Sequence, residues 1–219
     1  MLFLPMLGIF TINTMMNPWD SLYFESEWGF ALTLISLFTS LMAHYSNWFH
    51  SIAVHTSELA MGFNICIVPI FWSFMAPTFI NDWDEMLQSE GGKWLLFELC
   101  TVHSLPIITS ITELVITDMV FLKRDSKWNF IFGILYIFAN YAGYKANGEP
   151  MYDYPGLDWV NPWLTGGLFV FQAFVLYGIN YGIAVCTQKK HKFVERDSKG
   201  RALREEILEA HDLESKNKT

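Results

Sequence analysis

The sequence has few charged residues, few cysteines and no obvious processing signal. Only 16% of its 219 residues are charged whereas 52% are hydrophobic, a balance typical of a polytopic membrane protein rather than of a soluble core. The three cysteines form no CxxC pair and all lie in apolar runs, so we expect buried thiols and no disulfide framework. The chain begins apolar, with neither a basic segment nor a small-residue cleavage site, so we expect no cleavable signal peptide.

Motifs of several enzyme and binding classes are also absent. The chain has neither a Walker loop nor a GxGxxG fingerprint, and its formal charge of −8 argues against nucleic acid. His50 and His55 have the spacing of one desaturase-like histidine box, but a di-iron site needs several boxes. A haem between His44 and His103 would be compatible with two spans, yet single histidines are more often satisfied by hydrogen bonds. We therefore expect no metal and no cofactor, only bound lipids.

Long apolar runs fill most of the chain. A bilayer core of about 30 Å needs about 20 apolar residues as a helix. We expect an all-α fold, a polytopic transmembrane helix bundle over residues 1–188, followed by a polar tail, 189–219, that contains an amphipathic helix. A loop carrying His44, His50 and His55 should separate the second span from the third. About six spans are predicted, at residues 1–16, 28–48, 59–80, 94–122, 128–144 and 163–187.

Basic residues are distributed unevenly along the chain. The turn 123–127 carries three Lys or Arg residues and the tail carries nine, whereas the loops expected on the other side hold only Lys93 and Lys145. The positive-inside rule therefore places the turn and the tail on the same side of the membrane. With six spans, both termini lie on that side.

The fourth expected span, 94–122, concentrates the ionisable residues of the bundle. At about 100° per residue, His103, Ser110, Glu113 and Thr117 fall on one stripe. An ionisable group at the centre of a membrane helix costs roughly 3 kcal/mol on insertion scales, so this stripe should face protein or a wet cavity. Two interpretations stay open: a functional site around His103, or interhelical hydrogen bonds that hold the bundle together.

A hydroxyl nucleophile paired with a histidine is the remaining catalytic candidate. Threonine is a weak nucleophile at its free pKa and needs an adjacent base. Thr33, in the second span, and His103, in the fourth, could meet inside a bundle, although no spacing rule shows that they do. Asn64, the polar residue of the third span, could then donate to a developing oxyanion.

Four short motifs follow one another along the chain. They are Trp28-x-Phe30 with Thr33, Ile-Phe-Trp at 70–72, His103 with Glu113, and Tyr-Pro-Gly-Leu at 154–157. In this order, residues 28–186 resemble the androgen-induced family of multi-pass membrane hydrolases. The resemblance implies cleavage of fatty acid esters of hydroxy fatty acids, with Thr33 as nucleophile and His103 as base. The supporting residues would be Glu113, Ser110 and Asn64.

The tail and the last span suggest contacts with other proteins. Leu203 and Ile207 lie on one narrow apolar stripe, too small to stabilise an isolated helix of about 14 residues, so we expect a partner surface to cover them. Gly178 and Gly182 form a GxxxG face in the last span, which favours a neighbouring transmembrane helix. The aromatic loop 145–162 should lie on the bundle and offer a second docking surface.

Two functions therefore stay open from the sequence. The first, which we favour, is a non-catalytic accessory or structural subunit of a larger membrane complex, on a scaffold resembling the androgen-induced hydrolases. The second is an intramembrane Thr/His hydrolase of fatty acid esters. Small bundles of this kind occur in respiratory and similar complexes, so we expect the mitochondrial inner membrane, with the endoplasmic reticulum as the alternative. The expected partners are membrane lipids and other membrane subunits, not nucleic acid.

Overall fold

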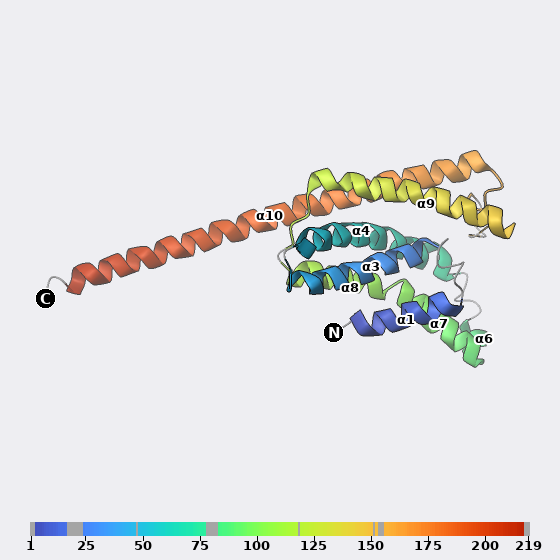
Figure 1. The fold of residues 1–219 in the computed structure, drawn as a ribbon, viewed down its shortest axis with the longest axis horizontal. Coiled ribbons are helices and arrows are strands. Elements are labelled where there is room, and N and C mark those ends of the chain that lie inside the picture. Colours follow the sequence, from blue (N-terminus) through green and yellow to red (C-terminus); the bar gives the residue numbers. More distant parts are fainter. Residues whose placement is uncertain are drawn as a thin grey trace.

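The chain folds into helices throughout the part that the structure, a computed structural model, describes (Figure 1). No strand occurs within that part. The side chains of residues 5, 13, 14, 16, 74, 75 and 192–216 lie outside the description. The described backbone covers residues 3–16, 24–46, 48–77, 83–117, 119–150, 152 and 156–216.

Ten helical elements make up the described fold. Eight are α-helices, η1 is π-helical and η2 is a single 3-10 turn. In chain order they are α1 (Phe3–Met16), α3 (Glu25–Ala43), α4 (Trp48–Ile70), η1 (Phe71–Met75), α6 (Trp83–Met86), α7 (Glu90–Val102), α8 (Leu105–Ile116), η2 (Lys123–Asp125), α9 (Ser126–Asn147) and α10 (Pro162–Lys216).

Helices α3 and α4 form the centre of the bundle. Figure 1 shows α9 and α10 along one side of this pair, and α1, α7 and α8 along the other. Phe63 of α4 and Leu176 of α10 share one buried cluster. Met6, Phe30 and Val102 join α1, α3 and α7 in another. The apolar core is therefore continuous across the bundle, with α3 and α4 contacting both outer layers.

Four helices are long and apolar enough to cross a membrane, which agrees with an integral membrane protein of all-α fold. The prediction of about six spans is not confirmed. Helix α1 has 14 residues, about 21 Å at 1.5 Å per residue, and is too short on its own. Helix α9 has 22 residues but is not among the four. The four candidate spans are Glu25–Ala43, Trp48–Ser73, Glu90–Ile116 and Pro162–His191.

The third expected span begins earlier than predicted. Helix α4 starts at Trp48, so His50 and His55 are helical and the prediction that they lie in a loop is wrong. Only His44, which follows the end of α3, lies outside a helix. The physical reason is that residues 48–58 contain neither proline nor glycine. The polar residues there mark the end of the bundle, not the end of a helix.

The fourth expected span is broken into two helices. Helix α7 ends at Val102, with His103 as its C-cap. Helix α8 begins with Leu105 and Pro106 in its first turn, where proline lacks only a hydrogen bond that is missing anyway. Helix α8 ends at Ile116, so the prediction of a continuous helix to residue 122 is wrong. The backbone N–H of Phe121 instead donates to Thr187 Oγ1 at 3.1 Å, which ties this segment to α10.

The aromatic loop 145–162 lies on the bundle where it is described, as expected. Trp159 is buried against Tyr136 of α9 and Phe169 of α10.

The three cysteines differ in their burial. Only Cys66 is buried, whereas Cys100 is half-buried and Cys186 is exposed. The expectation of three buried thiols is therefore wrong for the latter two.

Helix α10 is the longest element and extends far beyond the bundle. It has 55 residues, about 82 Å at 1.5 Å per residue, and Figure 1 shows its C-terminal half leaving the other helices. The helix passes through the expected domain boundary at residue 188 without a break. The apolar stripe expected at Leu203 and Ile207 lies outside the described side chains.

Candidate functional site

Thr33 lies at the centre of the bundle on α3 and is fully buried. Its Oγ1 donates to the carbonyl of Gly29 one turn earlier at 2.8 Å, a usual arrangement for threonine within a helix. The same oxygen accepts from Asn64 Nδ2 of α4 at 2.8 Å. A Cβ at Gly29 would stand 2.6 Å from Asn64 Oδ1. Glycine at 29 therefore makes room for the amide that reaches Thr33.

Asn64 also connects to the third helix of the site. Its Nδ2 donates to Ser110 Oγ of α8 at 3.2 Å. One amide thus links three helices through Thr33 and Ser110. The structure brings these three residues together.

Glu113 lies one turn beyond Ser110 on the same buried face of α8. Its Oε2 accepts from Ser36 Oγ of α3 at 2.9 Å, and its Oε1 accepts from Ser40 of the same helix. Ser57 of α4 lies 2.6 Å from Ser36 Oγ. Because a hydroxyl has one proton and Ser36 uses its own toward Glu113, Ser57 is the donor in that pair.

The three serines around Glu113 were not predicted from the sequence. A signal for two of them was present, because Ser36 follows Thr33 by three residues and Ser40 follows Ser36 by four, which places all three on one helix face. Ser57 fell in a segment assigned to a loop. The buried carboxylate is thus surrounded by hydroxyls from two other helices.

His103 lies at the break between α7 and α8. Its Nδ1 is 2.8 Å from the carbonyl oxygen of Leu99, and its ring stacks on Phe71 of η1 with centroids 3.6 Å apart and planes at 10°. Within the described residues, neither contact of Thr33 Oγ1 is with His103. The pairing of Thr33 with His103 therefore stays a prediction.

Among the described histidines, none forms a metal site with His103. His44 is exposed at the end of α3, so the haem interpretation stays untested. Among the described side chains, no group of three or more His, Cys, Asp or Glu residues is placed to hold a metal ion.

A second polar cluster lies at the end of the bundle where α3 begins and the aromatic loop follows α9. Tyr152 of the aromatic loop accepts from the backbone N–H of Glu25 at 3.1 Å and lies 2.9 Å from Tyr136 Oη of α9. Burial raises the pKa of the Tyr152 phenol above its usual value, so this hydroxyl keeps its proton. Trp159 Nε1 donates to Asn140 Oδ1 at 2.7 Å. These bonds hold the loop on the bundle.

Protein-family models, curated proteins and solved structures give no significant match to this chain. The similarity to the androgen-induced hydrolases therefore stays a resemblance in short motifs. What the site does has to be argued from its own geometry.

The buried polar groups of α3 form an almost continuous row. From Gly29 the row runs through Thr33 and Ser36 to Thr39, whose Oγ1 lies 3.1 Å from Thr56 of α4. The space between Ser57, Ser110 and Glu113 has no room for a water molecule. This arrangement satisfies polar groups within the bundle, and a substrate ester would have to displace side chains to enter it.

Proposed function

We propose that this chain is a non-catalytic integral membrane subunit, held together by its buried polar row and attached to partner subunits through α10. The observation that carries the proposal is the closed hydrogen bonding around Thr33 and Glu113. Both groups bond within the bundle, and the space beside Glu113 has no room for a water molecule. Interhelical hydrogen bonds of this kind contribute on average about 0.6 kcal/mol each in membrane proteins, which suits a structural role.

The outward face of α10 supports the second half of the proposal. A Cβ added at Gly178 or Gly182 would meet nothing within 4 Å. Tyr177 and Tyr181 beside them are also exposed and stack on each other with centroids 6.2 Å apart. A small-residue groove next to two aromatic rings fits a second transmembrane helix at close approach. The long extension of α10 then gives partner proteins an extramembrane surface.

We also propose that α9 crosses the membrane as a fifth span and that the short helix α1 enters it as a sixth. Helix α9 packs along α10 inside the same bundle, so it would cross beside it, with α1 partly inserted against α3. We retain the mitochondrial inner membrane as the proposed location, with the endoplasmic reticulum as the alternative. The proposed partners are membrane subunits that contact α10 and the 145–162 loop.

The test is co-purification from native membranes in a mild detergent. Leucine at Gly178 and Gly182 should release partner subunits without unfolding the chain, because nothing in the bundle occupies that space. The matched control is Gly166→Leu, which is equally open but lies about 120° away from Gly178 around the helix. Equal partner recovery from the double variant and the control would refute docking through this face.

The competing function is ester hydrolysis by Thr33 and His103. It is favoured by the motif resemblance and by the amide of Asn64 next to the Thr33 oxygen. In that mechanism His103 would take the Thr33 proton and return it to the leaving alcohol. Hydrolysis of a fatty acid ester of a hydroxy fatty acid that disappears in Thr33→Ala and in His103→Gln, with folding unchanged, would establish this function in place of ours.

A further inference from the structure

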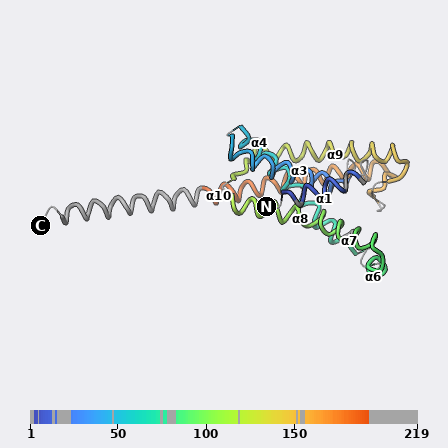
Figure 2. The backbone as a smooth tube through the Cα atoms, turned by 60° about the horizontal axis from the view of Figure 1, so that its bottom comes forward, coloured from blue at the N-terminus to red at the C-terminus, as the bar shows by residue number. Residues whose placement is uncertain are grey.

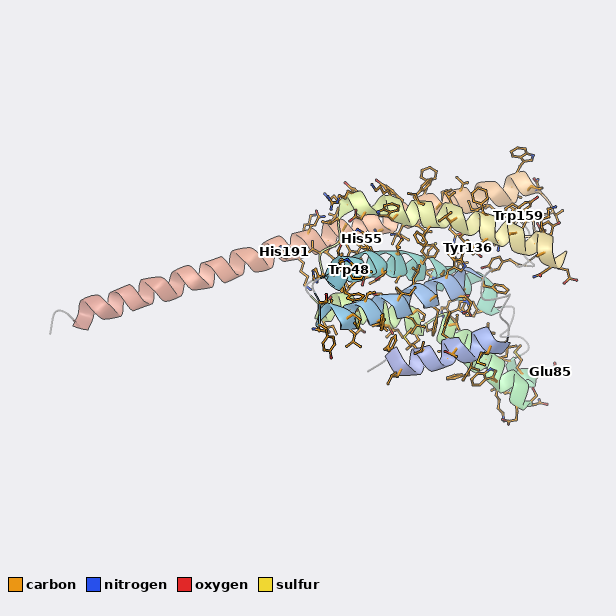
Figure 3. The ribbon with its side chains drawn as sticks, viewed as in Figure 1. Trp48, His55, Glu85, Tyr136, Trp159 and His191 are labelled. Atoms are coloured by element: carbon orange, nitrogen blue, oxygen red, sulfur yellow. The ribbon has the colours of Figure 1, made fainter. Side chains whose placement is uncertain are left out.

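A cavity of about 120 Å³ lies between α4 and α9, apart from the row around Thr33. It is at the end of the bundle where α9 begins and α10 leaves, and Figure 3 shows His55 at that end. The cavity has room for more than one water-sized molecule. Its lining residues are His55, Glu58, Leu59, Asp125, Trp128, Asn129 and Phe132.

Two carboxylates line this cavity, and among the described side chains the one Lys or Arg that pairs with either of them is the exposed Arg124, at Asp125 Oδ1. The Asp125 side chain is only 6% exposed. Its Oδ2 accepts no hydrogen bond, and its one close neighbour is His55 Nε2 at 3.4 Å. Glu58 is also buried, and its Oε1 accepts from the Leu122 backbone N–H at 2.7 Å. Buried carboxylates require a compensating cation or hydrogen-bond donor.

The residues that line the cavity favour an ammonium group over a metal ion. Among the described residues, His55, Glu58 and Asp125 are not close enough together to form a metal site. Trp128 and Phe132 supply aromatic walls, which attract organic cations. Asp125 Oδ2 lacks a hydrogen bond, so a primary ammonium, which has N–H donors, fits better than a quaternary one, which has none.

The rim of the cavity has the opposite charge. Arg124 is 78% exposed, with its Nε 3.5 Å from Asp125 Oδ1. Lys127 Nζ lies over the Trp128 ring, 5.4 Å from its centroid. A tryptophan and basic residues at the end of a membrane bundle are typical of the headgroup level. A ligand that places a cation inside and an anion outside therefore matches the charges of the site.

We propose that this cavity binds the headgroup of an aminophospholipid. The primary ammonium would lie between Asp125 and Glu58, and the phosphate would contact Arg124 and Lys127 at the rim. The acyl chains would run along the exposed surface of α9 next to Trp128. This site is separate from the partner face of α10 and does not depend on the chain being a non-catalytic subunit.

The first experiment uses the wild-type full chain and native mass spectrometry with three added phospholipids of identical acyl chains. Phosphatidylethanolamine should bind about tenfold more tightly than phosphatidylcholine or phosphatidic acid, because only it offers N–H donors to the carboxylates. Millimolar free ethanolamine should displace it. Equal binding of all three lipids would overturn the proposal. Binding of ethanolamine with no detectable binding of phosphatidylethanolamine would assign the site to a soluble amine instead.

The second experiment tests the carboxylates with near-isosteric variants. Asp125→Asn and Glu58→Gln should each weaken phosphatidylethanolamine binding about tenfold while leaving phosphatidic acid unchanged. Glu58→Gln retains an oxygen for the Leu122 N–H, and the Asp125 side chain caps no helix, so both should fold. Glu90→Gln removes an exposed carboxylate and is the control. If both cavity variants bind like the control, the cavity is not the lipid site.

Discussion

Asn64 is the residue on which the packing of the central helices depends most. A single side-chain amide contacts the hydroxyls of Thr33 and Ser110 from two different helices. In a membrane, such bonds have no competition from water, yet each contributes modestly because the separated helices also find partners. Asn64 therefore stabilises the bundle by joining α3, α4 and α8 through one side chain. It does so beside Gly29, where α3 comes close to this side chain.

Replacing Asn64 by alanine should lower the free energy of unfolding by about 1–3 kcal/mol, because two buried hydrogen bonds and part of the packing are lost. The measurement is denaturant unfolding of the full chain in detergent micelles. Thr112→Ala is the matched control, since its hydroxyl is exposed and bonds only to the Ile108 carbonyl of its own helix. A variant no less stable than this control would contradict the role given to Asn64.

At the scale of elements, a buried glycine lies at the contact between α4 and α9. A Cβ at Gly62 would stand 2.2 Å from Asn129 Oδ1, so the two helices approach with a glycine at the point of contact. Asn129 Nδ2 donates to the Glu58 carbonyl at 3.3 Å from the same position. This contact fixes the wall of the cavity between α4 and α9, which Figure 2 shows side by side.

Gly62→Ala should destabilise the bundle by about 1–3 kcal/mol, because the added methyl overlaps the buried Asn129 side chain. Gly167→Ala should be neutral or slightly stabilising, since nothing lies within 4 Å of its Cβ position and alanine favours helix. Thermal unfolding of both proteins in the same micelles checks this. Equal melting temperatures would show that α4 and α9 do not approach as closely as described.

Helical periodicity in the sequence predicted which residues share a helix face. It did not predict contacts between residues that are far apart in the sequence. The buried stripe with Ser110 and Glu113 was predicted because spacing within one helix suffices. The contacts with Ser36 and Ser57 were not predicted, since helical spacing places residues on one face of a helix but does not say which other helix that face meets. The break at His103 was also missed, because the apolar pattern continues through it and Pro106 is compatible with either a kink or a new helix.

At the scale of the whole molecule, the basic turn 123–127 and the extension of α10 lie at the same end of the bundle. Figure 1 shows the start of α9, which follows the basic turn 123–127, at the same end as the outgoing half of α10. The end of α9 and the described part of the aromatic loop lie at the opposite end. The basic turn thus lies at the other end of the bundle from the aromatic loop, as the positive-inside rule predicts for a bundle that spans a membrane.

Single cysteines placed on the two ends of α9 should test whether it crosses the membrane. In a cysteine-free background, Lys127→Cys and Lys189→Cys should react with an impermeant maleimide from the same side, and Glu149→Cys from the other. All three residues are exposed, so each should label fully. Labelling of positions 127 and 149 from one side would place α9 outside the membrane and reduce the bundle to fewer crossings.

The most direct test of the account is the native mass of the assembly after gentle extraction from its own membrane. A subunit that docks through α10 should run in a complex much heavier than its own 25.4 kDa, with partner chains in fixed ratio to it. The Gly178→Leu/Gly182→Leu protein should shift toward the mass of the free chain. A wild-type mass of one chain plus bound lipid would contradict the proposal that this protein is an accessory subunit.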